Sequence, residues 1–299
     1  MRVLVAGRIG QIATELVARL PAAGHAVVAL EPPELDITDA ASIARAFAAH
    51  RPEALVNAAA YTAVDRAEEE RDLAFAVNAT GPGLLGAAAA RAGIPVVHYS
   101  TDYVFDGMKG APYTEDDAPN PAGVYGASKL AGERALHAAN PRSTTLRTAW
   151  VCSPHGANFV KTMLRLAAER EELRVVADQH GAPSFADDLA DAAVALLPRL
   201  AAAKAGDAGF GVFHLTGAPH TTWHGFTQAI LAGAAARGRR VPRLLRITTA
   251  EYPTRARRPA DGRLDCSHAA RVLGIRAADW RASLDRCLDA LIGPQEITR

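Results

Sequence analysis

The sequence predicts an α/β protein built on a doubly wound parallel sheet, with a smaller mixed α/β region in its second half. Two observations predict this fold. Short apolar runs alternate with longer amphipathic stretches through the first half of the chain, and a glycine-containing turn follows the first apolar run. Strands buried on both faces lose their polar alternation, and helices of this length can cross over a parallel sheet. Sheets of this kind bind ligands at the carboxyl ends of their strands.

The elements of the first half follow from hydrophobic periodicity. The apolar runs predict strands at Val3–Ala6, Ala26–Leu30, Ala54–Asn57, Val96–Tyr99 and Thr144–Ala149. The amphipathic stretches predict helices at Gln11–Leu20, Ala40–His50, Leu73–Ala92 and Tyr125–Asn140. This regular alternation is typical of a Rossmann-type dinucleotide-binding domain, which we expect over residues 1–150.

The rhythm breaks after Val151, so we expect residues 151–299 to form mainly a second domain, with some elements returning to the first sheet. Expected helices are Asn158–Glu171, Asp188–Leu197, Trp223–Arg237 and Trp280–Ile292, and expected strands are Leu173–Ala177 and Gly211–Thr216. The stretches Arg239–Arg246 and Tyr252–Pro259 are interpreted as basic, proline-containing connections.

The bulk properties describe a soluble globular protein. The chain has 299 residues, is 49% hydrophobic and 22% charged, and has a formal net charge of +1 at pH 7. Without a basic block there is no support for nucleic-acid binding. No apolar run predicts a signal peptide or a membrane span, and three cysteines without metal-type spacing indicate reduced thiols. We therefore expect a cytoplasmic protein with no membrane partner.

A glycine turn, Gly7-Arg-Ile-Gly10-Gln-Ile-Ala13, links the first strand to the first helix. Gly7 allows the tight turn, and Gly10 lets backbone N–H groups approach a pyrophosphate at the helix N-terminus. The sequence lacks the Gly-Lys-Ser/Thr ending of a nucleoside triphosphate loop. The turn therefore predicts a nicotinamide dinucleotide, NADPH or NADH, as the cofactor.

The choice between the two cofactors stays open. Glu31 ends the second strand, where an acid accepts hydrogen bonds from ribose hydroxyls and favours NADH. Arg8 favours NADPH, because a guanidinium pairs with a 2′-phosphate. Glu31 as a merely solvated strand end is the alternative interpretation. Asp36 and Ile37 resemble a turn that seats the adenine edge.

Tyr125-Gly-Ala-Ser-Lys129 is the motif that indicates chemistry. Residues four apart on a helix project from one face, so the phenol and the ammonium lie together. A phenol has a reference pKa of about 10, and a neighbouring cation favours its ionised form. Tyr125 can then transfer a proton to a carbonyl oxygen as a general acid. On an isolated surface helix the same spacing would be a solvated face.

Polar residues also follow the third and fourth strands. Thr101 could hold a substrate carbonyl in line with Tyr125, or serve as a turn cap. The small residues after Asn57 leave room for a flat cofactor, although Asn57 could also pin neighbouring backbone.

Together these residues resemble the extended short-chain dehydrogenase/reductases and, among them, most closely the dTDP-4-dehydrorhamnose reductase family. The resemblance covers nearly the whole chain, with Ala13 in place of the usual third glycine. Its motifs are the Gly7–Gln11 turn, Val56–Asp65, His98–Phe105, Val124–Glu133, Leu146–Val151, Asn158–Leu164, Asp178–Pro183 and Ala256–Pro259.

The resemblance implies NAD(P)H-dependent reduction of the 4-keto group of dTDP-4-dehydro-L-rhamnose to dTDP-L-rhamnose, by a homodimer. It implies that Tyr125 is the proton donor, that Lys129 binds the nicotinamide ribose and tunes Tyr125, and that Thr101 polarises the keto oxygen. The implied cofactor contacts are Gly7, Gly10, Gln11, Ile12, Glu31, Asp36, Ile37, Ala60, Tyr61, Thr62, Tyr99, Tyr125 and Lys129. The implied substrate contacts are Thr101, Asp102, Trp150, Lys161 and Arg258, of which Lys161 and Arg258 could equally be surface charges.

Metal sites have little support in the sequence. Some bacterial members of the family hold magnesium between subunits through glutamates, and Glu15, Asp187 and Asp289 match or lie near such positions. His220 and His224 have helical spacing but no third ligand for zinc. We therefore assign no metal ligand.

Three alternative functions are weighed against the reductase. A dehydratase of this superfamily needs an acid after the aspartate of the fourth-strand motif, where this sequence has Tyr103. A reductase or an epimerase acting on another nucleotide-linked keto sugar keeps Tyr-x-x-x-Lys and is harder to exclude. A non-catalytic regulatory subunit has no need of an activated phenol.

Overall fold

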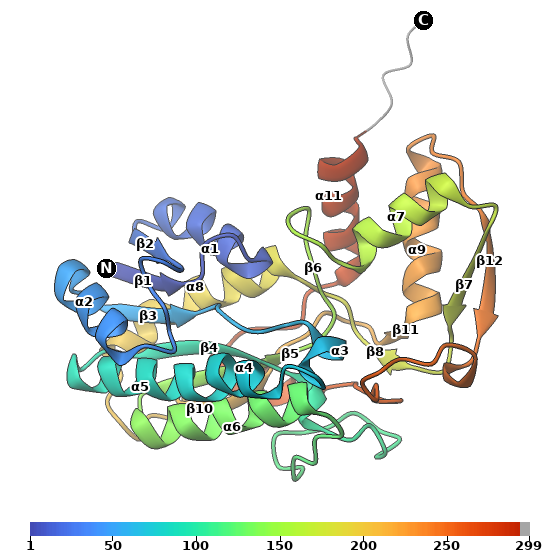
Figure 1. Ribbon diagram of the computed structural model, residues 1–299. Coiled ribbons are helices and arrows are strands. Elements are labelled where there is room, and N and C mark those ends of the chain that lie inside the picture. Colours follow the sequence, from blue (N-terminus) through green and yellow to red (C-terminus); the bar gives the residue numbers. More distant parts are fainter. Residues whose placement is uncertain (294–299) are drawn as a thin grey trace, which may run out of the picture.

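A six-stranded, all-parallel sheet forms the centre of the molecule, with strand order β10-β5-β4-β3-β1-β2 (Figure 1). The computed structural model describes residues 1–293. The strands are β1 Arg2–Ala6, β2 Ala26–Leu30, β3 Ala54–Asn57, β4 Val96–Thr101, β5 Ser143–Thr148 and β10 Gly211–His214. The order reverses between β1 and β3, which is the switch point where doubly wound sheets bind ligands. The predicted fold class is confirmed.

Helices cover both faces of this sheet (Figure 1). On one face lie α1 Gln11–Ala22, α8 Ala186–Ala202 and α10 Ser267–Leu273. On the other lie α2 Ala40–His50, α5 Gly81–Arg91 and α6 Val124–Ala139. In β1, Val3 and Val5 join the first core while Leu4 and Ala6 join the second. This alternation explains why the strand is apolar throughout.

The long helix expected at Leu73–Ala92 is interrupted. It consists of α4 Arg71–Phe75, a π-helical turn η1 Ala76–Thr80, and α5. Residues 71–91 are long and apolar enough to cross a membrane by length and composition, but α5 packs against α6 in the core. The π-helical turn carries Asn78 inward, and such turns occur frequently at functional sites.

The second half forms a lobe beside the sheet (Figure 1). Its elements are β6 Val151–Cys152, α7 Phe159–Glu169, β7 Glu172–Val176, β8 His180–Gly181, β9 Ser184–Phe185, β11 Thr221–Thr222, α9 Trp223–Ala236, β12 Arg243–Ile247, a 3-10 turn η3 Thr249–Glu251, and α11 Trp280–Ile292. Leu284 and Leu288 of α11 are buried in the hydrophobic core of this lobe, and Leu291 packs against that core. The apolar stripe of this helix is therefore core.

One connection was interpreted wrongly from the sequence. The basic stretch Arg239–Arg246 contains most of β12, which pairs in parallel with β7. Leu244 and Leu245 are half-buried between exposed arginines. Backbone pairing with β7 and these two apolar side chains therefore stabilise a strand despite the polar composition of the stretch. Helix α10 and the two-residue strands were also not expected, because they are too short for a periodic pattern.

Glycines let α6 pack closely on its neighbours. A Cβ added at Gly132 would lie 1.9 Å from the backbone oxygen of Asn78, and one at Gly126 would lie 2.0 Å from that of Tyr103. Tyr103 belongs to a short 3-10 turn, η2 Asp102–Val104, directly after β4. These contacts fix the depth of α6 over the carboxyl end of β4.

We predict that Gly132→Ala destabilises the protein by about 1–3 kcal/mol or more, because its methyl group meets backbone that cannot move aside. Urea unfolding measures this loss. The control is Ala131→Gly on the half-exposed side of the same helix, which should cost only about 1 kcal/mol through helix propensity. Equal losses in the two variants would contradict the close packing.

Candidate active site

Lys129 is held at the junction of α6 and β4. Its side chain is buried, with 2% of the residue exposed, and its Nζ donates a hydrogen bond of 2.7 Å to the carbonyl oxygen of Tyr99. Burial lowers the pKa of Lys129 to about 8, and the negative charge of Glu133 partly opposes that shift. A lysine with this pKa can change its charge near neutral pH, as groups in acid–base sites commonly do.

Tyr125 lies one helical turn before Lys129 and faces Thr101. Burial of its hydroxyl raises the pKa of Tyr125, while a hydrogen bond with Thr101 lowers it. The ring of Tyr103 meets the ring of Tyr125 edge to face, with centroids 5.5 Å apart. In the chain alone burial has the largest effect on this pKa, so the phenol carries its proton at neutral pH.

Thr101 fills the capping role considered for it. Its Oγ1 accepts a hydrogen bond from the backbone N–H of Tyr103 at 3.2 Å, which makes it the cap of η2. The same hydroxyl donates to Asp102 Oδ1 at 3.1 Å. Asp102 is 2% exposed, and burial raises its pKa to about 7. Thr101 therefore contacts both Asp102 and Tyr125, and these three residues form a cluster with Lys129 one helical turn further along α6.

Asn78 is a site residue that the sequence reasoning missed. From the π-helical turn its Oδ1 accepts from Tyr61 N at 2.9 Å, and its Nδ2 donates to Tyr61 O and to Ser128 Oγ. It therefore joins the loop after β3 to the turn of α6 between Tyr125 and Lys129. An asparagine among apolar residues in the middle of a predicted helix was the available signal.

The glycine turn presents backbone donors. Gly7 has a φ of +105°, and a Cβ at Gly10 would meet nothing within 4 Å, which leaves open space above the turn. The N–H groups of Arg8 and Ile9 both point at Glu31 Oε2, at 3.3 Å. The Arg8 guanidinium pairs with Glu34 at 2.9 Å and lies 3.8 Å from Glu31. Glu31 is thus more than a solvated strand end.

The other predicted cofactor residues border this turn in different ways. Asp36 accepts from the N–H and hydroxyl of Thr38, which lower its pKa, and Ile37 is buried against Gly81. Ile12 packs against the core, whereas Ala60, Tyr61 and Thr62 follow β3, with the Tyr61 hydroxyl on Glu70. Asn57 does pin backbone, because its Oδ1 accepts from Ala59 N at 3.1 Å.

Gln11 connects the turn to the second lobe. Its Oε1 accepts from Ser153 Oγ and Asn158 Nδ2, both at 3.0 Å, and its Nε2 donates to Val151 O at 3.3 Å. Asn158 in turn caps α7. The first helix of the sheet is therefore tied to the first helix of the second lobe.

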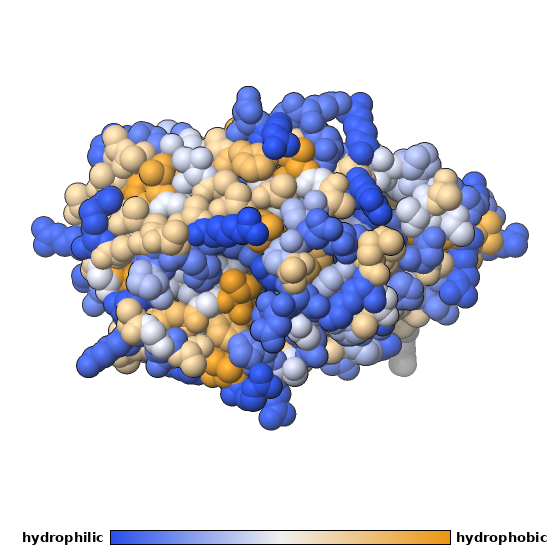
Figure 2. Space-filling model, turned by 90° about the horizontal axis from the view of Figure 1, so that it is seen from below, coloured by the Kyte–Doolittle hydropathy of each residue, from blue (hydrophilic) through white to orange (hydrophobic). Residues whose placement is uncertain are grey.

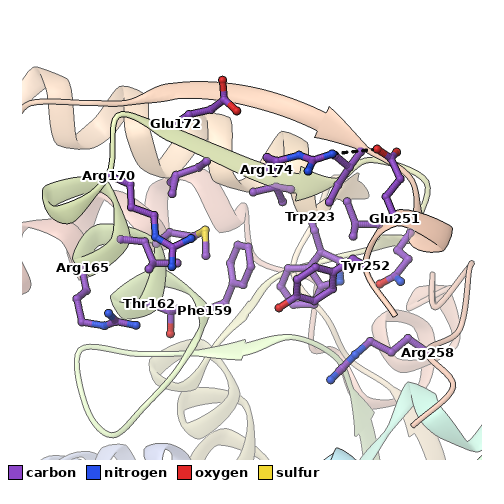
Figure 3. A pocket seen from close by; sticks show the side chains of 17 residues that line it. Phe159, Thr162, Arg165, Arg170, Glu172, Arg174, Trp223, Glu251, Tyr252 and Arg258 are labelled. Carbon is purple, nitrogen blue, oxygen red and sulfur yellow. Dashed lines mark hydrogen bonds and ion pairs between the residues drawn. The ribbon is translucent and has the colours of Figure 1, made fainter. Parts of the chain in front are cut away.

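A cavity of about 740 Å³ opens in the second lobe (Figure 3). Phe159, Trp223 and Tyr252 line its middle, with Arg165 and Arg170 on one side and Arg258 on the other. Trp223 stacks on Trp150 with centroids 3.6 Å apart, and Trp150 itself has a φ of +48°. The lining offers flat aromatic surfaces for a base and guanidinium groups for phosphates.

Arg258 links this cavity to the catalytic cluster. Its Nη1 donates to the hydroxyl of Tyr103 at 3.1 Å, and its Nη2 pairs with Asp65 at 2.8 Å. Asp65 lies on the short helix α3 Val64–Ala67, after the loop that contains Tyr61 and Thr62. The cavity wall therefore contacts both the ring that packs on Tyr125 and the segment expected to hold the cofactor.

Two predicted residues are not brought into the cluster. The side chain of Tyr99 is buried toward α8, where its hydroxyl donates to Leu189 O at 2.9 Å, so only its backbone carbonyl faces Lys129. The ammonium of Lys161 donates to Pro154 O at 3.2 Å and is not among the residues that line the cavity.

The acids considered for magnesium do not fit a metal site within the described chain. Glu15 and Asp187 both face the Arg19 guanidinium, whereas Asp289 pairs with Arg237. A guanidinium already neutralises each of these acids. Residues 1–293 contain no cluster of three or more potential metal ligands, and His220 bonds to Leu264 O.

The buried carboxyl of Asp102 predicts a pH dependence of stability. Its pKa of about 7 in the folded chain lies above the ordinary value of 3.8, so the folded state binds the proton more tightly than the unfolded state. The stabilising effect of the tighter proton binding is fully present below pH 3.8 and is lost as the pH rises through 7. Each unit by which folding raises the pKa corresponds to about 1.4 kcal/mol of stability. Asp102→Asn should remove this loss. Urea unfolding from pH 4 to 8 checks it, and parallel curves for the two proteins would contradict it.

The chain is similar to known proteins over nearly its whole length. Residues 1–292 match the family model described as RmlD substrate binding domain. A dTDP-4-dehydrorhamnose reductase of Sinorhizobium fredii is 44% identical over 292 residues, 98% of each chain. A crystal structure of a dTDP-4-dehydrorhamnose reductase from Clostridium acetobutylicum has a TM-score of 0.90 at 35% identity, covering 97% of this chain and 99% of that one. The crystal structure of the dTDP-4-dehydrorhamnose reductase from Bacillus anthracis in complex with NADP has a TM-score of 0.89 at 33% identity. It covers 96% of this chain and 98% of that one.

A family model that spans almost the whole chain, and a relative 44% identical to it end to end, agree with the motifs around Tyr125 and Lys129. The chain therefore belongs to the RmlD family, that of the dTDP-4-dehydrorhamnose reductases.

Proposed function

We propose that this protein reduces the 4-keto group of dTDP-4-dehydro-L-rhamnose with NADPH or NADH, which yields dTDP-L-rhamnose. The observation that carries the proposal is the cluster of Thr101, Tyr125 and Lys129 at the carboxyl end of β4. It lies at the ligand-binding edge of a doubly wound sheet and is joined through Arg258 to an aromatic, arginine-lined cavity.

The residues of the chain supply the proton and hold the substrate. When bound, the nicotinamide supplies the hydride to the C4 carbon of the sugar. The Thr101 hydroxyl donates a hydrogen bond to the keto oxygen, and the Tyr125 hydroxyl transfers its proton to that oxygen as negative charge develops there. The ammonium of Lys129 stabilises the tyrosinate that remains until a proton from solvent restores the phenol.

The glycine turn fits a dinucleotide. The N–H groups of Arg8 and Ile9 already hold a carboxylate oxygen at 3.3 Å, so they can hold a phosphate oxygen of the cofactor equally well. Gly7, Gly10, Gln11, Ile12, Glu31, Asp36, Ile37, Ala60, Tyr61 and Thr62 are the proposed cofactor contacts, together with Tyr99, Tyr125 and Lys129. For Tyr99 the contact is proposed through its backbone.

The dTDP moiety is proposed to lie in the cavity of the second lobe. Trp223, which stacks on Trp150 and lies against Phe159, belongs to the aromatic wall proposed to hold thymine. Arg258 bonds Tyr103 and Asp65 with two of its N–H groups, and its remaining N–H groups are proposed to bind the pyrophosphate. Asp102 faces the sugar end. Lys161 lies outside the cavity lining, which favours a structural role for it. Residues 1–150 are proposed to bind the cofactor, and residues 151–299 mainly the substrate.

We also propose that the protein is a cytoplasmic homodimer without nucleic-acid or membrane partners. The family resemblance and the mixed surface support this. The face in Figure 2 carries several separate hydrophobic patches among hydrophilic side chains. The large apolar residues Leu73 and Met108 are 49% and 67% exposed.

The competing functions have less support. Tyr103 packs on Tyr125 and receives a hydrogen bond from Arg258, so no acid stands where a dehydratase needs one. UDP-glucose 4-epimerases, such as that of Thermus thermophilus, share the fold at only 22% identity. An intact cluster at Tyr125 argues against a regulatory subunit.

We predict that Tyr125→Phe abolishes turnover while the Kd for NADPH stays nearly unchanged, because the variant loses only the proton donor. Loss of a positioned general acid costs about 10²–10⁴-fold in rate. Absorbance of the reduced nicotinamide with the 4-keto sugar measures turnover, and fluorescence titration measures cofactor binding. Undiminished reduction by this variant would refute the mechanism.

The opposite charges of Glu31 and Arg8 predict how cofactor preference is set. Glu31→Gln should raise kcat/KM for NADPH relative to NADH by roughly tenfold, because it removes a charge that repels a 2′-phosphate. Arg8→Gln should change the same ratio in the opposite direction. Initial rates with each cofactor measure both. A ratio that moves in the same direction in both variants would be inconsistent with these roles.

A further inference from the structure

A buried ion pair lies directly behind the catalytic cluster. Arg147 on β5 and Glu133 on α6 have side chains that are 5% and 3% exposed, and they bond at 2.9 and 2.7 Å through Nε and Nη2. Ser100 on β4 donates a third hydrogen bond to the Glu133 carboxylate at 2.5 Å. Buried charged pairs often contribute little net stability against an apolar replacement, so their retention calls for another explanation.

The position of Glu133 supplies that explanation. Tyr125, Lys129 and Glu133 are spaced by four residues on α6, so their side chains follow one face of the helix. The same face is fixed to three consecutive residues of β4: the Tyr99 carbonyl holds Lys129, the Ser100 hydroxyl holds Glu133, and the Thr101 hydroxyl meets Tyr125. Glu133 is therefore the third residue on this face of α6 that contacts β4, after the proton donor Tyr125 and its neighbouring cation Lys129.

We propose that Glu133, held in place by Arg147, is a positioning residue of the reduction that fixes both the location and the charge of Lys129. The proposal rests on the function proposed above for Tyr125 and Lys129. Glu133 itself touches neither the substrate nor the cofactor; it acts through Lys129.

The charges around Lys129 support this role. Apart from Lys129 itself, the titratable and charged groups on α6, β4, η2 and β5 are Tyr125, Glu133, Arg134 and His137 of α6, His98 and Tyr99 of β4, Asp102 and Tyr103 of η2, and Arg147 of β5. Burial lowers the pKa of both histidines, which keeps them neutral, and raises the pKa of the three tyrosines. Of these groups, Glu133 is the one whose charge raises the pKa of Lys129.

The sign of the expected effect follows from the mechanism. Reduction requires the ammonium form of Lys129. Without the negative charge of Glu133, Lys129 loses its proton at a lower pH, so the alkaline limb of the pH–rate profile moves down. Without Arg147, the Glu133 carboxylate loses the two hydrogen bonds that hold it in place, so Arg147→Met tests the positioning of Glu133.

The test compares kcat/KM against pH in five proteins: wild type, Glu133→Gln, Glu133→Asp, Arg147→Met, and the double variant Glu133→Gln/Arg147→Met. We expect the alkaline limb of the pH–rate profile to shift to lower pH by roughly half a unit or more in Glu133→Gln and in the double variant. It should stay near the wild-type value in Glu133→Asp, which keeps the carboxylate. The double variant removes both charges of the ion pair, so it is expected to fold even if Glu133→Gln does not.

The matched control is Asp116→Asn, an exposed acid without a hydrogen bond in the described chain, which changes net charge by the same amount. Its limb should not move. If the limb stays in place in every folded variant that lacks the Glu133 carboxylate, or moves equally in Asp116→Asn, the proposal is wrong.

A second readout separates this proposal from the function itself. The Kd for NADPH is measured by fluorescence against pH without any sugar. We expect the alkaline weakening of NADPH binding to begin at lower pH in Glu133→Gln than in wild type. If this shift occurs but wild type reduces no 4-keto sugar, the proposed function fails and the role of Glu133 stands. If wild type reduces the 4-keto sugar and neither profile shifts, the proposed function stands and the role of Glu133 fails.

Discussion

The attachment of α6 to the carboxyl end of β4 is the constraint on which the catalytic geometry depends. Lys129 reaches a backbone carbonyl of β4, and Gly132 and Gly126 allow the helix to approach backbone atoms of Asn78 and Tyr103. A side chain at either glycine would lift α6 away from the strand. The phenol and the ammonium are thus positioned by backbone contacts that the central sheet holds rigid, and not by a loop.

The same attachment explains why several polar side chains are buried here. Lys129, Asp102 and Glu133 are each almost fully enclosed, and each is bonded to at least one partner. Burial moves the pKa of Lys129 down to about 8 and that of Asp102 up to about 7, toward one another and toward neutrality. A solvated site with the same residues would leave both groups with fixed charges at neutral pH.

Much of the fold and of the catalytic cluster could be predicted from the sequence, because both have short-range signals. The strands of the sheet are continuous apolar runs, and Tyr125 and Lys129 have the spacing of one helical face. What could not be predicted depends on contacts distant in sequence. Strand β12 exists because β7 pairs with it, and the inward placement of Asn78 requires a π-helical turn that no periodic pattern signals. The orientation of Tyr99 depends on α8, ninety positions away.

The ion pair between Arg258 and Asp65 has a mechanical consequence. Asp65 accepts from both the guanidinium of Arg258 and the backbone N–H of Ala256, so one carboxylate secures a stretch of the cavity wall. Asp65 lies only three residues after Thr62, in a segment whose backbone Asn78 holds. A displacement of the loop after β3 must therefore carry the cavity wall with it. A molecule that orders the loop after β3 therefore reduces the entropy cost of ordering this stretch of the cavity wall.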